Sequence, residues 1–180
     1  SSDDGVKVKV ALLERLVSKV ASVAERHDVT SEDLASTFLC VAVAGDTFLG
    51  AHVGDGVVGF LKHGDLRVIS GPDNSEFANQ TTFVTSSRAL ESMRLFRGSL
   101  DGVDGFILMS DGAGESLFDS RTGQLAKACS KLISTVAAMR GSQNKTSEHR
   151  KRLRRLVDIT IRDATKDDCS IGIFGRAATQ

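Results

Sequence analysis

The sequence contains no tryptophan and no tyrosine, so its nine phenylalanines are its only aromatic residues. This composition disfavours a platform on which nucleic-acid bases or sugar rings stack. Lysine plus arginine and aspartate plus glutamate number 23 each, so the formal net charge of zero gives no basic field to attract nucleic acid or a membrane. The one basic cluster lies within residues 150–155, where a solvated helix face is the preferred interpretation over an anion site.

The three cysteines, Cys40, Cys129 and Cys169, are far apart, and each lies in apolar sequence. They predict buried free thiols in a reducing compartment, and no Cys-x-x-Cys or Cys/His pair suggests zinc. The sequence has neither a signal peptide nor an apolar run near the length of a membrane span. These absences predict a cytoplasmic protein with no membrane partner.

The 180 residues, 41% hydrophobic and 26% charged, suit a single domain over residues 1–180 with a sizeable core. Helical spacing of apolar residues predicts helices over residues 6–27, 124–139 and 146–164. Between the first two helices, short β-branched runs separated by tight turns predict an antiparallel meander. The expected strands are residues 37–44, 47–53, 57–62, 66–70, 81–85, 93–96 and 106–109, with a last strand at 170–175. This order indicates an α+β layered domain.

An abrupt change of polarity follows the apolar run at residues 106–109. Ser110, Asp111 and Gly112 come directly after this expected buried strand, and Glu115 adds a second carboxylate four residues later. A carboxylate at the end of a core strand is rigidly held, and the glycine beside it lets the backbone approach a bound group closely. An ordinary Asp-Gly turn is the alternative interpretation.

Two further strand ends carry acids. Asp55 lies between two glycines in the turn before residues 57–62, and Asp167 and Asp168 precede the last strand. Three acidic strand ends in one small domain predict a site for magnesium or manganese, which prefer carboxylate and water oxygens. A bound cation also compensates the repulsion among crowded carboxylates.

The expected loop at residues 71–80 contains the only proline and no apolar periodicity. Its acids and amides predict a flap over a site. Glu76 and Asn79, with Thr81 beyond the loop, are candidates for substrate contacts. A turn network that holds the loop together explains the same residues equally well.

Together these motifs resemble those of the metal-dependent protein phosphatases of type 2C, the PPM family. The matching features are the Gly-Asp-Gly hairpin at 54–56, the Ser-Asp-Gly at 110–112 and the Asp-Asp-X-Ser at 167–170. The stretch SEFANQTTFVT at 75–85 is similar to a loop of a bacterial branch of that family. The resemblance implies an antiparallel β-sandwich flanked by helices, in αββα order.

The resemblance also implies a two-metal site that uses Mn²⁺ or Mg²⁺. Asp111 and Asp167 match metal ligands, and Asp168 stands where the family often has asparagine. Asp55 and Glu115, together with Asp111, resemble a weaker third metal site. A phosphoprotein serine/threonine phosphatase is implied, in which a metal-bound water attacks phosphorus without a covalent phosphoenzyme. A cognate Ser/Thr kinase is the implied partner.

One family motif is not matched. The family carries an early Asp-Gly, usually DGxG, whose aspartate bridges the two metals, whereas Asp3-Asp4-Gly5 here lacks the following glycine. We therefore expect a chain that begins after this motif, as a fragment or a degenerate member, with an incomplete sandwich at its N-terminal part. The alternatives are an active phosphatase, a pseudophosphatase or protein-binding module, and acids that are only turn residues. His52 and His63 are expected to be a packed side chain and a turn residue, without catalytic roles.

Overall fold

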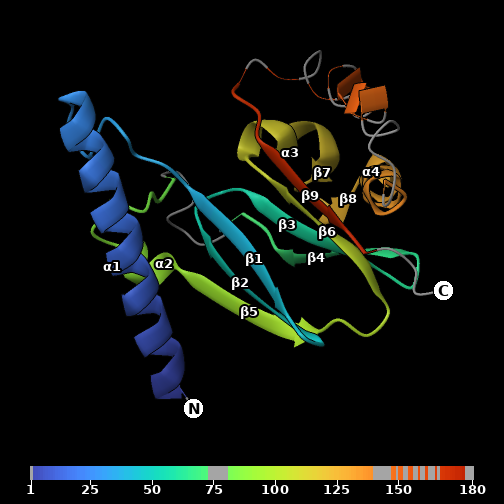
Figure 1. The fold of residues 1–180 in the computed structure, drawn as a ribbon, viewed down its shortest axis with the longest axis horizontal. Helices are drawn as coiled ribbons and strands as arrows, with labels where there is room; N and C mark the ends of the chain where they lie inside the picture. Colours follow the sequence, from blue (N-terminus) through green and yellow to red (C-terminus); the bar gives the residue numbers. More distant parts are fainter. Residues whose placement is uncertain are drawn as a thin grey trace.

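The computed structural model describes residues 2–72, 81–139, 147–148, 150–151, 154–155 and 167–176, together with residues 158, 161 and 165. Within these residues, two antiparallel sheets lie face to face (Figure 1). The first sheet has the order β1-β2-β5, and its strands are Phe38–Ala44, Thr47–Val53 and Arg94–Ser99. The second has the order β4-β3-β6-β9, with strands Asp65–Ser70, Val57–Lys62, Val103–Met109 and Ile171–Gly175.

Phenylalanine side chains fill the space between the two sheets. Phe48 of β2 meets Phe106 of β6 edge-on, with ring centroids 4.9 Å apart, and Phe60 of β3 stacks near Phe106 at 6.4 Å. Phe48 alternates with exposed residues along β2, whereas Phe106 lies in a part of β6 whose residues are buried on both faces of the sheet. Aromatic pairs of this geometry stabilise the core beyond the area that they bury.

Helices cover the outer faces of the sandwich (Figure 1). The apolar stripe of α1 (Ser2–His27), which includes Leu12, Leu16 and Val20, packs on the cluster of Val53, Val84 and Met93 at the three-stranded sheet. On the four-stranded sheet, α4 (Lys127–Ala137) contacts β6 and β9 through buried Cys129, Leu132 and Ile133. This arrangement confirms the expected α+β sandwich flanked by helices.

The remaining elements are short. They are α2 (Ala89–Ser92), α3 (Asp111–Leu117), β7 (Phe118–Asp119) and β8 (Gln124–Leu125). The helix expected over residues 124–139 begins only at Lys127, because Gln124 and Leu125 pair with Asp119 and Phe118 in a small ribbon. Of the helix expected over residues 146–164, the described residues 147–148, 150–151 and 154–155 are α-helical, and residues 158 and 161 are π-helical. The rest of that range lies outside the described residues.

Two sequence predictions are wrong. The strand expected at residues 81–85 does not form; Val84 instead buries its side chain against α1 and Met93, and its amide donates to the Ser36 carbonyl at 2.9 Å. Val84 therefore serves packing rather than strand pairing. Cys169, expected to be buried, is exposed, whereas Cys129 is buried and Cys40 is partly buried.

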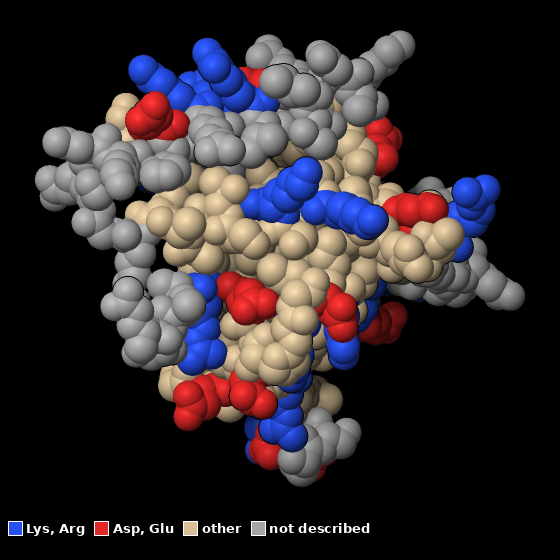
Figure 2. Space-filling view, turned by 90° about the vertical axis from the view of Figure 1, so that its right-hand side faces the viewer, with Lys and Arg blue, Asp and Glu red and all other residues tan. Residues whose placement is uncertain are grey.

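The surface in Figure 2 carries interspersed acidic and basic side chains. This pattern agrees with the balanced charge of the sequence. Among the described helices, none is both long and apolar enough to cross a membrane.

Candidate active site at one edge of the sandwich

Three strands of the four-stranded sheet reach the same edge. Val57 pairs with Met109, and Met109 pairs with Ile171, so these three residues form one row across β3, β6 and β9. Because the strands are antiparallel, β3 and β9 begin at this row and β6 ends there. The acids just outside the row therefore gather at one edge, close to α3 and the start of β9 (Figure 1).

The end of β6 is fastened to the segment before β9 by Ser110. The Ser110 amide donates to the Ser170 carbonyl at 3.0 Å, and the Ser170 amide donates to the Ser110 hydroxyl at 3.0 Å. The Ser110 hydroxyl also donates to the Asp168 carbonyl at 3.4 Å. Asp111 and the pair Asp167–Asp168 are thus held side by side, although 56 positions separate Asp111 from Asp167 in the sequence.

Gly112 allows α3 to begin against this segment. A Cβ atom at Gly112 would lie 2.7 Å from the Asp168 carbonyl oxygen and 3.2 Å from the Asp167 Cβ, so a side chain at this position would force a backbone shift. The alternative interpretation, an ordinary Asp-Gly turn, does not hold, because Asp111 and Gly112 begin the helix α3. Asp111 stands at the N-terminus of this helix, where a negative charge is favourable.

Four of the carboxylates lie close enough to the thiol of Cys169 to act on it electrostatically. The pKa of Cys169 is raised first by its limited burial and then by the negative charges of Asp167, Asp168, Glu115 and Asp111. All four carboxylates are exposed. The arrangement brings together acids from the end of β6, from α3 and from the segment before β9, and it produces a region of negative charge that is open to solvent.

The donor chemistry of this region fits a hard cation, because carboxylate oxygens are the ligands that Mg²⁺ and Mn²⁺ prefer. Among the described residues, however, no three His, Cys, Asp or Glu side chains are placed to hold one ion together. Mg²⁺ is commonly held by one or two carboxylates and several waters. The residues present therefore suit an ion held by one or two of these carboxylates with water, rather than an ion enclosed by protein.

Asp55 lies just outside the same row, at its β3 end. Its turn lies against the end of β6, since a Cβ atom at Gly56 would lie 2.5 Å from the Met109 carbonyl oxygen. The half-buried Asp55 carboxylate accepts a hydrogen bond from the Thr81 hydroxyl at 2.5 Å. The Asp55 turn therefore lies against the end of β6, with one carboxylate oxygen of Asp55 engaged by Thr81.

The other sequence candidates have different positions. Asp3, Asp4 and Gly5 belong to α1, and Asp4 lines a groove with Leu49 and Arg97 on the outer face of the three-stranded sheet. Glu76 and Asn79 lie outside the described residues.

Sequence reasoning missed Arg94 at the start of β5. Its guanidinium donates to the carbonyl oxygen of Gly54 at 2.8 Å and lies 3.2 Å from the Nε2 atom of buried His52. His52 is packed, as expected, and is fully buried. No local signal in the sequence marks Arg94, because its partners are distant along the chain.

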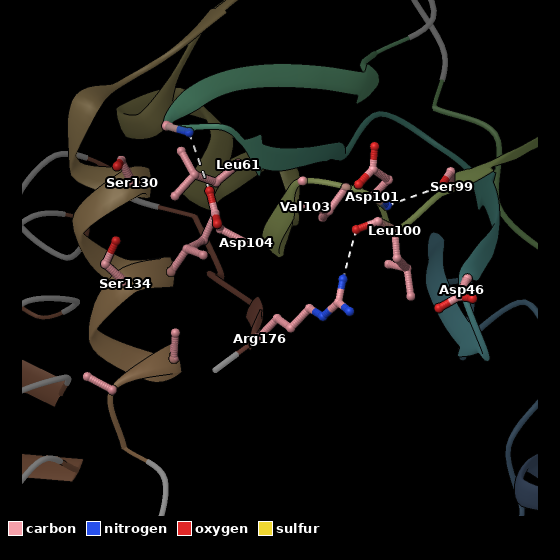
Figure 3. Close-up of a pocket in the computed structure, with 15 residues that line it drawn as sticks. Asp46, Leu61, Ser99, Leu100, Asp101, Val103, Asp104, Ser130, Ser134 and Arg176 are labelled. Atoms are coloured by element: carbon pink, nitrogen blue, oxygen red, sulfur yellow. Dashed lines mark hydrogen bonds between the residues drawn. The ribbon is translucent and has the colours of Figure 1, made fainter. Parts of the chain in front are cut away.

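A hollow lies at the opposite end of β6 from Asp111 (Figure 3). Its volume is about 1000 Å³, and its polar lining includes Asp46, Asp101, Asp104 and Arg176. Arg176 donates to the Leu100 carbonyl at 2.9 Å, and Asp104 accepts from the Gly64 amide at 3.4 Å. This hollow shares no residue with the acidic edge, the region that carries Asp55, Asp111, Glu115, Asp167 and Asp168. Its mixture of charges favours no single class of ligand.

Comparison with known proteins identifies the family. The model of the protein phosphatase 2C family matches residues 2–158. The chain belongs to the protein phosphatase 2C family. A comparison with curated protein sequences finds no match.

Solved structures of protein phosphatase 2C type share the fold. A bacterial serine phosphatase variant is 16% identical, with a TM-score of 0.57 over 91% of this chain and 63% of its own. Stp1 of Staphylococcus aureus is 15% identical, with a TM-score of 0.57 and coverage of 93% and 65%. The catalytic domain of PstP, solved with two manganese ions, is 17% identical, with a TM-score of 0.54 and coverage of 87% and 65%. The chain thus spans slightly less than two thirds of the length of these phosphatases.

Proposed function

We propose that this chain is the catalytic part of a metal-dependent protein serine/threonine phosphatase that hydrolyses phosphomonoesters of phosphoproteins. The observation that carries the proposal is the row Val57–Met109–Ile171, which brings the acidic ends of three strands to one edge in a member of the protein phosphatase 2C family. The manganese ions of PstP support the choice of Mn²⁺ or Mg²⁺ as cofactor.

In this proposal Asp111 and Asp167 hold a cation, while Glu115 and Asp55 contribute to a weaker neighbouring site. When bound, the cation supplies an activated water and neutralises charge on the phosphoryl oxygens. The protein holds Asp111 beside Asp167 through Ser110, so the two carboxylates are positioned before any ion arrives. Glu76 and Asn79 remain candidates for substrate contacts.

The biological setting is part of the same proposal. We infer that residues 1–180 form one domain of a bacterial, cytoplasmic phosphatase that opposes a cognate Ser/Thr kinase. Solved bacterial serine/threonine phosphatases of the same fold support this setting. PppA of Pseudomonas aeruginosa, described as a key regulatory component of T6SS, has the same fold at 20% identity and a TM-score of 0.51.

A catalytically incomplete pseudophosphatase or protein-binding module is the second candidate. One observation favours it: Asp4, from the only early Asp-Gly of the chain, lies in α1 and lines a groove on the outer sheet face. It therefore does not join the acidic edge as a bridging ligand. The lack of a three-residue metal group among the described residues points in the same direction.

A manganese titration by calorimetry separates the two candidates. The wild-type chain is compared with Asp111→Asn and Asp167→Asn, and Asp101→Asn in the distant hollow serves as the matched control. Loss of even a supporting partner typically lowers metal affinity by about 10- to 100-fold, so loss of a ligand should cost at least as much. Asp101→Asn should bind like the wild type.

Hydrolysis of an aryl phosphate and of a phosphothreonine peptide is measured on the same samples. Binding with turnover, both lost in the two edge variants, supports the phosphatase. Binding without turnover supports the incomplete module. Binding that is unaffected by Asp111→Asn and Asp167→Asn contradicts the placement of the metal at this edge.

A further inference from the structure

Arg94 bonds to two segments that flank the acidic edge. Its guanidinium donates one hydrogen bond to the Gly54 carbonyl, in the turn that carries Asp55, at 2.8 Å. It donates another to the Gly71 carbonyl, just beyond the end of β4. Charge-assisted hydrogen bonds of this kind are stronger and more directional than neutral ones, and the planar guanidinium fixes their relative geometry.

His52 orients the guanidinium. The Nε2 atom of His52 lies 3.2 Å from Nη2 of Arg94, and its Nδ1 atom lies 2.8 Å from the Ser70 hydroxyl. Because arginine can only donate, Nε2 must accept, and the imidazole hydrogen is therefore on Nδ1, from which it donates to Ser70. Burial and the nearby charge of Arg94 lower the pKa of His52 to about 3, which keeps this tautomer neutral at physiological pH.

Thr81 and Thr82 also contact the turn that carries Asp55. The Thr81 hydroxyl donates to the Asp55 carboxylate at 2.5 Å. Gly54, with a φ of +113°, is packed so closely that a Cβ atom would lie 2.4 Å from the Thr37 methyl and 3.4 Å from the Thr82 carbonyl oxygen. Gly71 and Thr81 bound the stretch 72–80, so both ends of that stretch are fastened to one turn, by Arg94 and by Asp55.

We propose that Arg94, oriented by His52, is a positioning residue that couples the Asp55 turn to both ends of residues 72–80. Arg94 holds the backbone of the turn, and Thr81 holds the Asp55 carboxylate that the turn carries. The relevance to catalysis rests on the proposed function, but the coupling is a property of the described residues alone. A purely structural arginine would stabilise the whole domain without linking these two segments.

Hydrogen exchange measured by mass spectrometry on the metal-free chain tests the coupling. In Arg94→Lys the positive charge is kept, but one ammonium group cannot reproduce the fork that spans Gly54 and Gly71. Exchange should accelerate by about tenfold or more in two peptides, residues 50–58 and 66–72, which carry Gly54 and Gly71. Residues 81–88 should follow through the bond between Thr81 and Asp55, and exchange should be unchanged in α4, which lies on the far sheet. Arg97→Lys, on the exposed part of the same strand, is the matched control and should leave both peptides as in the wild type.

Conservative and disruptive changes at His52 refine the test. His52→Gln offers an amide oxygen that can replace Nε2 as the acceptor for Arg94, so exchange should stay close to wild type. His52→Leu removes the acceptor and should reproduce the Arg94→Lys pattern. Acceleration spread evenly over all peptides, or acceleration in only one of the two, overturns the proposal in favour of a general stabilising role or of independent segments.

Manganese binding and turnover are then measured on the same variants. If the wild-type chain binds manganese, Arg94→Lys and His52→Leu should lower its affinity while His52→Gln largely retains it. If the wild-type chain does not bind manganese, the proposed function fails, and the exchange data still decide whether Arg94 couples the two segments. The two failures are therefore distinguishable.

Discussion

Ser110 and Ser170 exchange two hydrogen bonds of 3.0 Å across the end of β6 and the start of β9. Ser110 precedes α3, yet its hydroxyl makes no bond to the amides of that helix. Because the hydroxyl accepts from the Ser170 amide and donates to the Asp168 carbonyl, it joins two strand ends instead of capping a helix. The spacing of Asp111 and Asp167 depends on this joint.

Ser110→Ala tests the joint. The substitution leaves the Ser170 amide without its side-chain acceptor, and we expect a loss of about 1 kcal/mol in the free energy of unfolding. Manganese affinity should fall as well, because Asp167 and Asp168 lose their tie to β6. Thermal melts and calorimetry provide the measurements. Ser99→Ala, which removes a turn hydrogen bond to the Asp101 amide at the opposite end of the sheet, should leave manganese binding unchanged.

Gly112→Ala and Gly114→Ala form a matched pair in α3. At Gly112 the new Cβ meets the Asp168 carbonyl at 2.7 Å, so we expect a net loss of about 1–3 kcal/mol from overpacking. At Gly114 the nearest atom is a methyl carbon of Val57 at 3.7 Å, an ordinary contact. Alanine there should stabilise the helix by up to about 1 kcal/mol. Equal effects of the two changes in urea unfolding would contradict the close packing of α3 on residues 167–168.

The alkylation rate of Cys169 reports on the surrounding carboxylates. Iodoacetamide should modify exposed Cys169 first, whereas Cys129, buried and with a pKa raised to about 11 by burial, should react only on unfolding. Asp167→Asn or Asp168→Asn removes a charge that raises the pKa of Cys169, so its alkylation should accelerate by about two- to threefold at low ionic strength and less in high salt. Asp101→Asn should have no effect. Rates that do not respond to the edge variants would place those acids away from the thiol.

His52 should make stability depend on pH. Its folded pKa of about 3 lies below the ordinary value of 6.5, so between these values the unfolded chain binds a proton that the folded chain does not. Stability should therefore fall as the pH falls through this window, and His52 contributes no slope above it. Between pH 6.5 and pH 5, protonation of His52 in the unfolded chain should lower the free energy of unfolding by about 2 kcal/mol.

Urea unfolding at pH 5, 6 and 7 compares the wild type with His52→Gln, which cannot titrate. As the pH falls from 7 to 5, the free energy of unfolding should decrease more in the wild type than in His52→Gln. Parallel curves would contradict a buried, neutral His52.

Much of the fold could be predicted from the sequence because the strand pattern is local. Alternating apolar residues and Gly-Asp turns located β1 to β4 within one or two residues, and the apolar run before Ser110 located β6. The prediction was wrong at residues 81–85, where Val84 packs under α1 instead of pairing in a strand. Strand propensity alone cannot distinguish these outcomes, because it measures fit to a half-buried surface of either kind.

The burial of Cys169 was also wrong for a physical reason. Cys169 lies next to the apolar strand β9 in sequence, but it precedes the first paired residue, Ile171, and remains with the solvent-facing acids. Its neighbours along the chain therefore did not indicate its environment. The placement of acids at strand ends could be predicted, whereas their distances from one another depend on strand pairing.

The sequence by itself determined which residues could carry the chemistry, because Asp55, Asp111 and Asp167 lie at strand ends whatever the topology. Only the tertiary structure decided that these ends meet, through the pairing of Val57 with Met109 and of Met109 with Ile171. It likewise decided the role of Arg94, whose contacts with His52, Gly54 and Gly71 join residues 23 to 42 positions away. The contacts with His52 and Gly54 follow from the pairing of β5 with β2, in which His52 lies opposite Arg94, whereas the contact with Gly71 forms only when the two sheets pack. No pattern along the chain could have indicated them.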